Sequence, residues 1–192
     1  GRREGAAIGE CLRPDPLGLG FDSVRFQGVS CEVYRPLHIN ETPMLFSSRE
    51  SAEGIKYASN ALLATKITFI NEMADLCEKV GADVKDVARG IGLDKRIGPN
   101  FLHAGPGFGG SCFPKDTLAL LKTSQDHQAP SRIVEAVVAV NDARKRAMAD
   151  KIAAALGDVR GKTIAILGLT FKPNTDDMRE APALAIVPAL QA

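Results

Sequence analysis

The amino-acid sequence predicts an α/β protein in which a mainly α-helical central part is flanked by short α/β segments. An apolar pattern with helical spacing runs from Ser48 to Val80 without a proline, and a second runs from Ser131 to Ala155. Residues 163–169 (TIAILGL) form a short apolar run, which is typical of a strand in a parallel sheet that is covered on both faces. Long helices followed by such a strand indicate a helical part and an α/β part joined in one chain.

Changes of pattern divide the chain into three parts. Residues 17–21 and 43–46 indicate two short strands, separated by a helix that Asp22 or Ser23 caps. A turn at Gly157 to Gly161 precedes the apolar run. We therefore expect an α/β segment over 1–46, a helical central domain over 47–156 and the start of a second α/β domain over 157–192. The opening residues GRREG (1–5) show no helix or strand start, and the last residues, ALAIVPALQA (183–192), stop inside a predicted helix, so we expect the protein to continue beyond both ends of the printed sequence.

Composition excludes several classes of function. The 24 Lys and Arg residues balance 23 Asp and Glu residues, so no broad basic surface is available for nucleic acid or acidic membranes. No apolar run is long enough to cross a bilayer and no signal sequence opens the chain, so we expect a cytoplasmic protein. The four cysteines include no CxxC pair and no histidines at metal-ligand spacing, which argues against a metal site.

The pattern over residues 48–80 carries more apolar residues than one helix face needs. Apolar residues recur every seven positions, at Ile55, Leu62, Phe69 and Leu76. Others, such as Leu63 and Ile70, lie off this stripe, and a helix of this length would extend about 50 Å. We expect a second copy of the chain to cover one face, giving a homodimer through this helix. A central helix buried within its own chain is the alternative.

The loop GPGFGG (Gly105 to Gly110) matches the dinucleotide fingerprint GxGxxG in its spacing but not in its context. A true fingerprint follows an apolar strand and opens directly into a helix, whereas this loop follows PNFLH (99–103). Its glycines would instead let backbone amides approach a ligand closely or adopt positive φ. A flexible surface loop is the alternative.

Cys112 directly follows this loop. Pro114 suits the first position of a helix, and the pattern predicts a helix over Thr117 to Lys122. The thiol would therefore lie just ahead of the positive end of that helix and near Lys115. Both neighbours favour the thiolate, which is the nucleophilic form of cysteine. The alternative is a buried structural cysteine.

Lys56 and Asn60 form a second polar pair. They are four residues apart on the predicted long helix and therefore share a face. One cationic and one neutral donor pointing the same way can stabilise an oxyanion that develops on a carbonyl carbon. The alternative is an ordinary solvated first helical turn.

Several longer motifs together resemble the UDP-glucose/GDP-mannose dehydrogenase family. They are REG (3–5), YRPL (34–37), ESAEGIKYASNALLATKITFINEMADLCEKVGAD (50–83), RIGPNFLHAGPGFGGSCFPKDT (96–117) and GLTFKPNTDDMRE (168–180). The segment GFGGSCFPKD (107–116) is far more specific than a lone glycine motif. The resemblance implies partial Rossmann-like α/β segments at both ends. It also implies oxidation of a nucleotide sugar at C6 to an acid, in two hydride transfers to NAD+ and through a cysteine-linked intermediate.

The same resemblance implies the roles of individual residues. Cys112 matches the nucleophile, Asp116 a residue that positions or activates the hydrolytic water, and Glu4 a residue implicated in water activation. Lys56 and Asn60 match residues that stabilise the thiohemiacetal oxyanion. The substrate-binding residues would be Lys56, Asn60, Arg96, Phe101, Leu102, His103, Ala104, Gly105, Gly109 and Lys172, with Arg96 reaching the substrate of a neighbouring subunit. The cofactor-binding residues would be Glu4, Lys115 and Arg179.

The sequence also bears on the substrate, on the class of function and on the place of the cofactor site. Phe113 to Asp116 favour UDP-glucose, with UDP-glucuronate as product, and GDP-mannose or a UDP-amino sugar is the alternative within the family. An alternative from another class is a non-catalytic module for dimerisation and nucleotide binding. The sequence holds no strand followed by GxGxxG, so we expect the main NAD site to lie outside it and this chain alone to be inactive, with weak or no NAD binding.

Overall fold

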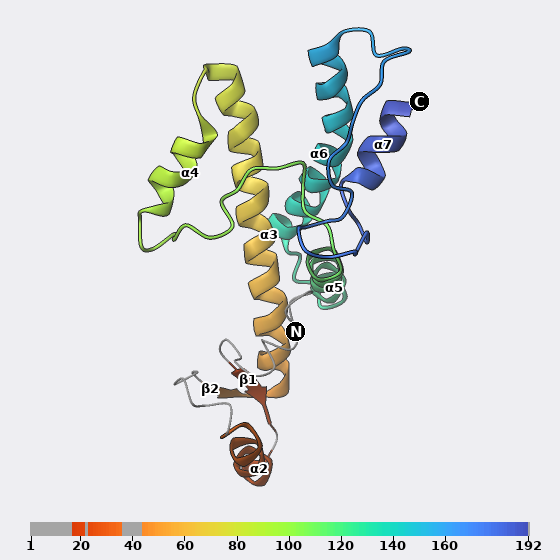
Figure 1. Ribbon diagram of the computed structural model, residues 1–192. Helices are drawn as coiled ribbons and strands as arrows, with labels where there is room; N and C mark the ends of the chain where they lie inside the picture. The colour runs from red at the N-terminus through yellow and green to blue at the C-terminus, as the bar shows by residue number, and fades with distance from the viewer. Residues whose placement is uncertain (1–16, 22, 36–43, 192) are drawn as a thin grey trace. The chain divides into compact units, whose positions relative to one another are not determined.

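The computed structural model describes residues 17–21, 23–35 and 44–191 of the chain (Figure 1). These residues fall into two compact units that divide within one long helix, between Ser59 and Asn60. The first unit carries a small parallel sheet, and the second is built from helices and their connecting loops. The predicted fold class, a mainly helical α/β chain, is confirmed.

The first unit contains a strand–helix–strand arrangement. β1 (Leu17–Gly20) and β2 (Met44–Ser47) pair in parallel, with Gly20 opposite Ser47, and α2 (Val24–Tyr34) lies between them in the chain. Ser23 caps α2, because its side chain accepts a hydrogen bond from the Phe26 N–H. A Cβ at Gly20 would lie 2.7 Å from Cα of Arg49, so only glycine allows the strand to pass the helix that follows β2.

That following helix is α3 (Arg49–Val80), which confirms the prediction over 48–80. Ser48 accepts a hydrogen bond from the Ser51 N–H at 3.1 Å and so caps its start. Hydrogen bonds from its own backbone N–H and from Ser48 lower the pKa of the Glu50 carboxyl. Gly81, at φ 74°, ends the helix, and the Ala82 N–H then donates to the Cys77 carbonyl.

Four more helices follow in the second unit. They are α4 (Val84–Gly92), α5 (Cys112–Asp126), α6 (Arg132–Leu156) and α7 (Ala183–Gln191). α6 packs against both α5 and α7 (Figure 1). The central cluster joins Ala64 of α3, Val137 of α6 and Phe108 of the connecting loop, so the glycine-rich loop contributes a side chain to the core.

Two predicted elements differ from the structure. α5 begins at Cys112 rather than near Thr117, so Cys112 lies in the first helical turn instead of ahead of it. Pro114 is accommodated there because the first-turn N–H groups have no intrahelical acceptor. The strand predicted over 163–169 is wrong: the segment has no regular structure, and Leu167 is 96% exposed. Its apolar residues would form a strand only against a neighbouring strand, and no described residue provides one.

Candidate functional site

Cys112 occupies the entrance of α5 and is partly buried. Ser111, the residue before it, makes no side-chain capping hydrogen bond. The thiol therefore lies at the end of the helix where the partial positive charge of the backbone amides is concentrated. Cys112 is only partly buried, whereas Cys77 of α3 is buried.

Asp116 lies one turn further along α5. Its side chain is 1% exposed, accepts a hydrogen bond from Nδ2 of Asn60 at 2.5 Å and is ion-paired with Lys115. Residues four apart on a helix share a face, so Asp116 and Cys112 point to the same side of α5. The hydrogen bond thus brings the Asn60 amide to the face of α5 that carries the thiol.

This arrangement bears on one of the two expectations for Asn60, the solvated helical turn. Its side chain is 8% exposed, so it does not belong to a solvated helical turn. Asp116 fixes the direction of the carboxamide, and a carboxamide nitrogen has a second N–H to donate to a ligand. Lys56, its predicted companion, is partly buried on α3 in the first unit.

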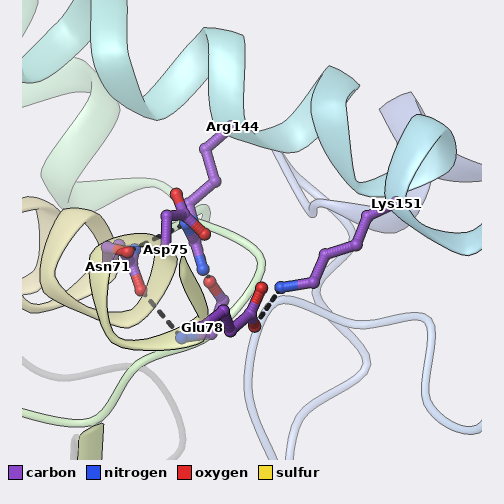
Figure 2. A network of polar contacts seen from close by, with 6 residues as sticks. Asn71, Asp75, Glu78, Arg144 and Lys151 are labelled. Carbon is purple, nitrogen blue, oxygen red and sulfur yellow. Dashed lines mark hydrogen bonds and ion pairs between the residues drawn. The ribbon is translucent and has the colours of Figure 1, made fainter. Parts of the chain in front are cut away.

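The glycine-rich loop, residues 105–110, is held in place rather than free at the surface. The Gly105 N–H donates to Oδ1 of Asn71 at 2.8 Å, and the Gly105 carbonyl accepts from Nε of Arg144 at 2.6 Å. Figure 2 shows Asn71 of α3 and Arg144 of α6 in this network. Arg144 also forms an ion pair with Asp75, with 2.6 Å between Nη1 and Oδ2. Both backbone groups of Gly105 are therefore used within the protein.

The last two glycines of the loop contact the chain beyond α6. A Cβ at Gly109 would lie 2.2 Å from the Glu180 carbonyl oxygen, and a Cβ at Gly110 would lie 2.7 Å from the Phe171 ring. The Gly110 N–H also donates to the Arg179 carbonyl at 2.7 Å. These glycines are thus required for close approach of two backbones, and the loop does not have the geometry of a dinucleotide fingerprint.

Arg96 lies in a tight turn after α4. Its guanidinium donates to both carboxylate oxygens of Asp94, and its N–H donates to Oδ1 of the same residue at 2.9 Å. These bonds lower the pKa of the Asp94 carboxyl and raise that of Arg96. Lys66 of α3 donates to the carbonyl of Ile97 at 3.0 Å, which ties the turn to the long helix.

The other predicted substrate residues surround the start of the loop. Phe101 has a φ of 64°, and its ring lies edge-on to Phe113 at 6.1 Å between centroids. Leu102 is buried and, with His103 and Ala104, lines a cavity of about 440 Å³ beside α4.

Two of the remaining predicted residues lie in the segment beyond α6 that contacts Gly109 and Gly110, and one lies outside the described residues. Lys172 lies 5.3 Å from the centroid of the Phe171 ring, and Arg179 is paired with Asp177. Glu4, like Cys11, lies outside the described residues.

Four buried polar residues that bind the loop or the Glu180 segment packed against it were not predicted. They are Asn71, Asn141, Arg144 and Lys145. The last three share a face of α6 at helical spacing, but α6 also carries charged residues on its other faces, so no local signal distinguished them. Among the described residues, no group of three or more His, Cys, Asp and Glu side chains is placed to hold a metal ion, and no helix there is long and apolar enough to cross a bilayer.

A cysteine at a helix entrance, with a buried carboxylate and an oriented amide on the same side, is the kind of arrangement found at enzyme active sites. Comparison with known families identifies the kind. The central domain of the UDP-glucose/GDP-mannose dehydrogenase family matches residues 50–143, and the UDP-binding domain of that family matches residues 165–192. The chain belongs to this family.

Individual relatives agree with the family assignment. A UDP-glucose 6-dehydrogenase of Rhizobium meliloti (strain 1021) is 68% identical, over 98% of this chain and 44% of the relative. A UDP-glucose dehydrogenase from Pyrobaculum islandicum has a TM-score of 0.92 at 40% identity, over 98% of this chain and 43% of that one. An NDP-N-acetyl-D-galactosaminuronic acid dehydrogenase from Methanosarcina mazei Go1 has a TM-score of 0.80 at 26% identity, over 95% of this chain and 41% of that one. The chain therefore spans less than half the length of these relatives.

Proposed function

We propose that this chain supplies the thiol-bearing part of a UDP-glucose 6-dehydrogenase, which oxidises UDP-glucose to UDP-glucuronate. The observation that carries the proposal is the position of Cys112 in the first turn of α5, on the same face as the buried Asn60–Asp116 pair. The 68% identity to a relative of that name supports UDP-glucose over GDP-mannose or a UDP-amino sugar.

The chemistry of the site follows from these side chains. The Cys112 thiolate adds to the C6 aldehyde of the sugar, forming a C–S bond and moving the carbonyl π electrons onto oxygen. Asn60, together with Lys56, donates hydrogen bonds to the oxyanion of this thiohemiacetal. After oxidation to the thioester, water adds to the carbonyl carbon, Asp116 orients it and accepts its proton, and the C–S bond breaks to release the acid and the thiolate.

NAD, when bound, supplies the hydride acceptor for both oxidations. The described residues do not form a dinucleotide site, since the only GxGxxG spacing among them lies in the loop that packs against Arg179 and Glu180. In the proposal, Lys115 and Arg179 approach a cofactor that another part of the protein holds. Both side chains are largely exposed, at 65% and 59%.

The exposed face of α3 supports a homodimer. Leu62 is 64% exposed, Leu76 52% and Val80 66%, so described parts of the chain leave this apolar stripe uncovered. A second copy fits it, because a two-fold axis across the middle of the helix places the same stripe against itself. Lys66 holds the Arg96 turn next to this stripe, consistent with Arg96 reaching the substrate of the partner copy.

A chimera tests the catalytic proposal. In it, residues 1–192 replace the matching segment of the Rhizobium meliloti relative, which provides the remaining parts of the enzyme. We expect the chimera to form UDP-glucuronate from UDP-glucose and NAD+, and Cys112→Ser to abolish acid formation because no thioester can form. Cys31→Ser removes a free thiol of the first unit and should leave the activity unchanged.

The same assay separates the alternatives. Acid formation that survives Cys112→Ser would contradict the covalent mechanism. A chimera that oxidises only GDP-mannose or a UDP-amino sugar would contradict the proposed substrate.

A further inference from the structure

Asn141 of α6 grips the middle of the glycine-rich loop with both of its polar groups. Its Oδ1 accepts a hydrogen bond from the Phe108 N–H at 2.8 Å, and its Nδ2 donates to the Phe108 carbonyl at 3.1 Å. Asn141 is 4% exposed and Phe108 7% exposed, so both bonds are shielded from water. The carboxamide therefore replaces the partner strand that an ordinary extended segment would have.

The neighbouring glycine fits this grip. Gly107 has a φ of 117°, and a Cβ there would lie 3.0 Å from Oδ1 of Asn141 and 3.1 Å from Cγ of Lys145. A larger residue would both strain the backbone and push α6 away from the loop. Gly107 and Asn141 are thus matched: the absence of a side chain at one lets the carboxamide of the other reach Phe108.

Two aromatic rings connect the residue that Asn141 holds to the residue next to the thiol. The Phe108 ring meets the Phe113 ring edge-to-face, with centroids 5.8 Å apart and planes at 82°. Phe113 directly follows Cys112 in the first turn of α5. Phe108 also packs with Ala64 and Val137, so its ring cannot shift without disturbing the central cluster.

We propose that Asn141 is a positioning residue for the Cys112 chemistry: by fixing the backbone of Phe108 it fixes Phe113 and the helical turn that presents the thiol. The inference rests on the proposed function of Cys112 but concerns a residue outside the proposed catalytic and binding residues. Four of the six residues in the loop are glycines, so the loop loses much conformational entropy when it is ordered, and a side chain that holds it has a large effect on its geometry.

Two substitutions test the role. Asn141→Ala removes both hydrogen bonds. Asn141→Asp keeps the shape and the acceptor for the Phe108 N–H but places a carboxylate oxygen against the Phe108 carbonyl. Val134→Ala is the matched control, because Val134 is a buried residue of the same helix that makes no hydrogen bond to the loop.

The first readout is the rate at which iodoacetamide alkylates Cys112 in the 192-residue chain, followed by peptide mass spectrometry. We expect both Asn141 variants to change this rate more than about threefold, while Val134→Ala leaves it unchanged. The second readout is turnover in the chimera. There we expect kcat to fall about 10- to 100-fold in the Asn141 variants, with a smaller change in KM, because the thiol is misplaced rather than the substrate lost.

The outcomes are distinguishable. The inference would be overturned if the Asn141→Asp variant folds and has the same alkylation rate and kcat as Val134→Ala. A residue with a purely structural role would give that result. If Asn141→Ala does not fold, Asn141→Asp decides. A native chimera that forms no acid contradicts the proposed function, and the alkylation rates then decide on Asn141 alone.

Discussion

The two faces of α3 reverse the usual distribution of side chains, because small residues are buried and large apolar residues are exposed. The buried face is lined mainly by small or polar residues, namely Asn60, Ala61, Ala64, Thr68, Asn71, Ala74 and Cys77, with Ile70 the one large aliphatic among them. The exposed face carries large apolar residues, namely Ile55, Leu62, Phe69, Leu76 and Val80, which are between 40% and 66% exposed. Hydrophobicity alone therefore does not identify the face that packs within the chain.

Close approach explains the buried face. The glycine-rich loop and α6 reach the α3 backbone region through Asn71 and Ala64, and larger side chains there would keep them apart. The exposed face has no such requirement, and its large residues suit a second helix of the same kind. The difference teaches that small residues mark where the chain folds on itself, whereas the exposed heptad stripe is the surface that the proposed dimer would use.

The buried face is tested most strongly at Ile70, which is 0% exposed. We expect Ile70→Ala to lower the free energy of unfolding by about 2 to 5 kcal/mol, because a cavity replaces the lost side chain. Urea denaturation measures the loss. The matched control is Ile133→Ala at a residue that is 69% exposed, where the expected change is within about 0.5 kcal/mol. Equal losses at the two isoleucines would show that this face of α3 is not the core.

A charged residue placed on the exposed face of α3 tests whether this face binds a second copy of the chain. We expect Leu62→Glu to weaken self-association by about 3 kcal/mol or more, roughly 100-fold in Kd, because each dimer would lose two buried leucines. Sedimentation equilibrium over a concentration series measures Kd. Leu118→Glu on α5 changes a leucine that is 54% exposed and should leave association intact. A native chain that sediments as a monomer at every concentration would refute the dimer.

Two ion pairs between α3 and α6 give a smaller contrast (Figure 2). Arg144, with a side chain 8% exposed, pairs with Asp75 and also donates to the carbonyls of Asn71 and Gly105, whereas Lys151, 44% exposed, pairs only with Glu78 among the described residues. We expect Arg144→Met to cost about 1 to 3 kcal/mol, since two carbonyls lose a donor. Lys151→Met should cost less than about 1 kcal/mol. Urea denaturation measures both free energies of unfolding. Equal losses in the two variants would show that the hydrogen bonds of Arg144 to the two carbonyls do not stabilise the chain.

Local sequence signals predicted the helices well but not what holds the site together. α3 and α6 were predicted close to their observed ends because helical periodicity and capping depend on neighbours within a few residues. The glycine loop, by contrast, is fixed by Asn71, Asn141 and Arg144, which lie 33 to 39 positions from the loop residues they bind. Nothing local to those residues specifies such a partner.

The site itself was predicted in outline. Residue types alone left Asn60 as either an oxyanion donor or a solvated polar residue, and the fold, by burying it against Asp116, excludes the solvated reading. Residues 163–169 show the opposite limit, because an apolar run predicts a strand only where a neighbouring strand exists to receive its hydrogen bonds. The domain limits at 47 and 157 stay a prediction.

The Arg96 turn, which Lys66 holds beside the exposed face of α3, provides the smallest effect. Since Arg96 lowers the pKa of the Asp94 carboxyl, their pairing contributes fully above the unfolded pKa of about 3.9 and is lost as the pH falls through the lower folded value. We therefore expect the turn to be unchanged from neutral pH down to about 4 and to open only below it. Arg96→Gln should raise the Asp94 pKa toward its usual value, whereas Lys95→Gln should not. A ¹³C NMR titration of the Asp94 carboxyl measures both, and equal values in the two variants would show that Arg96 is not preformed at the face where the partner is proposed to bind.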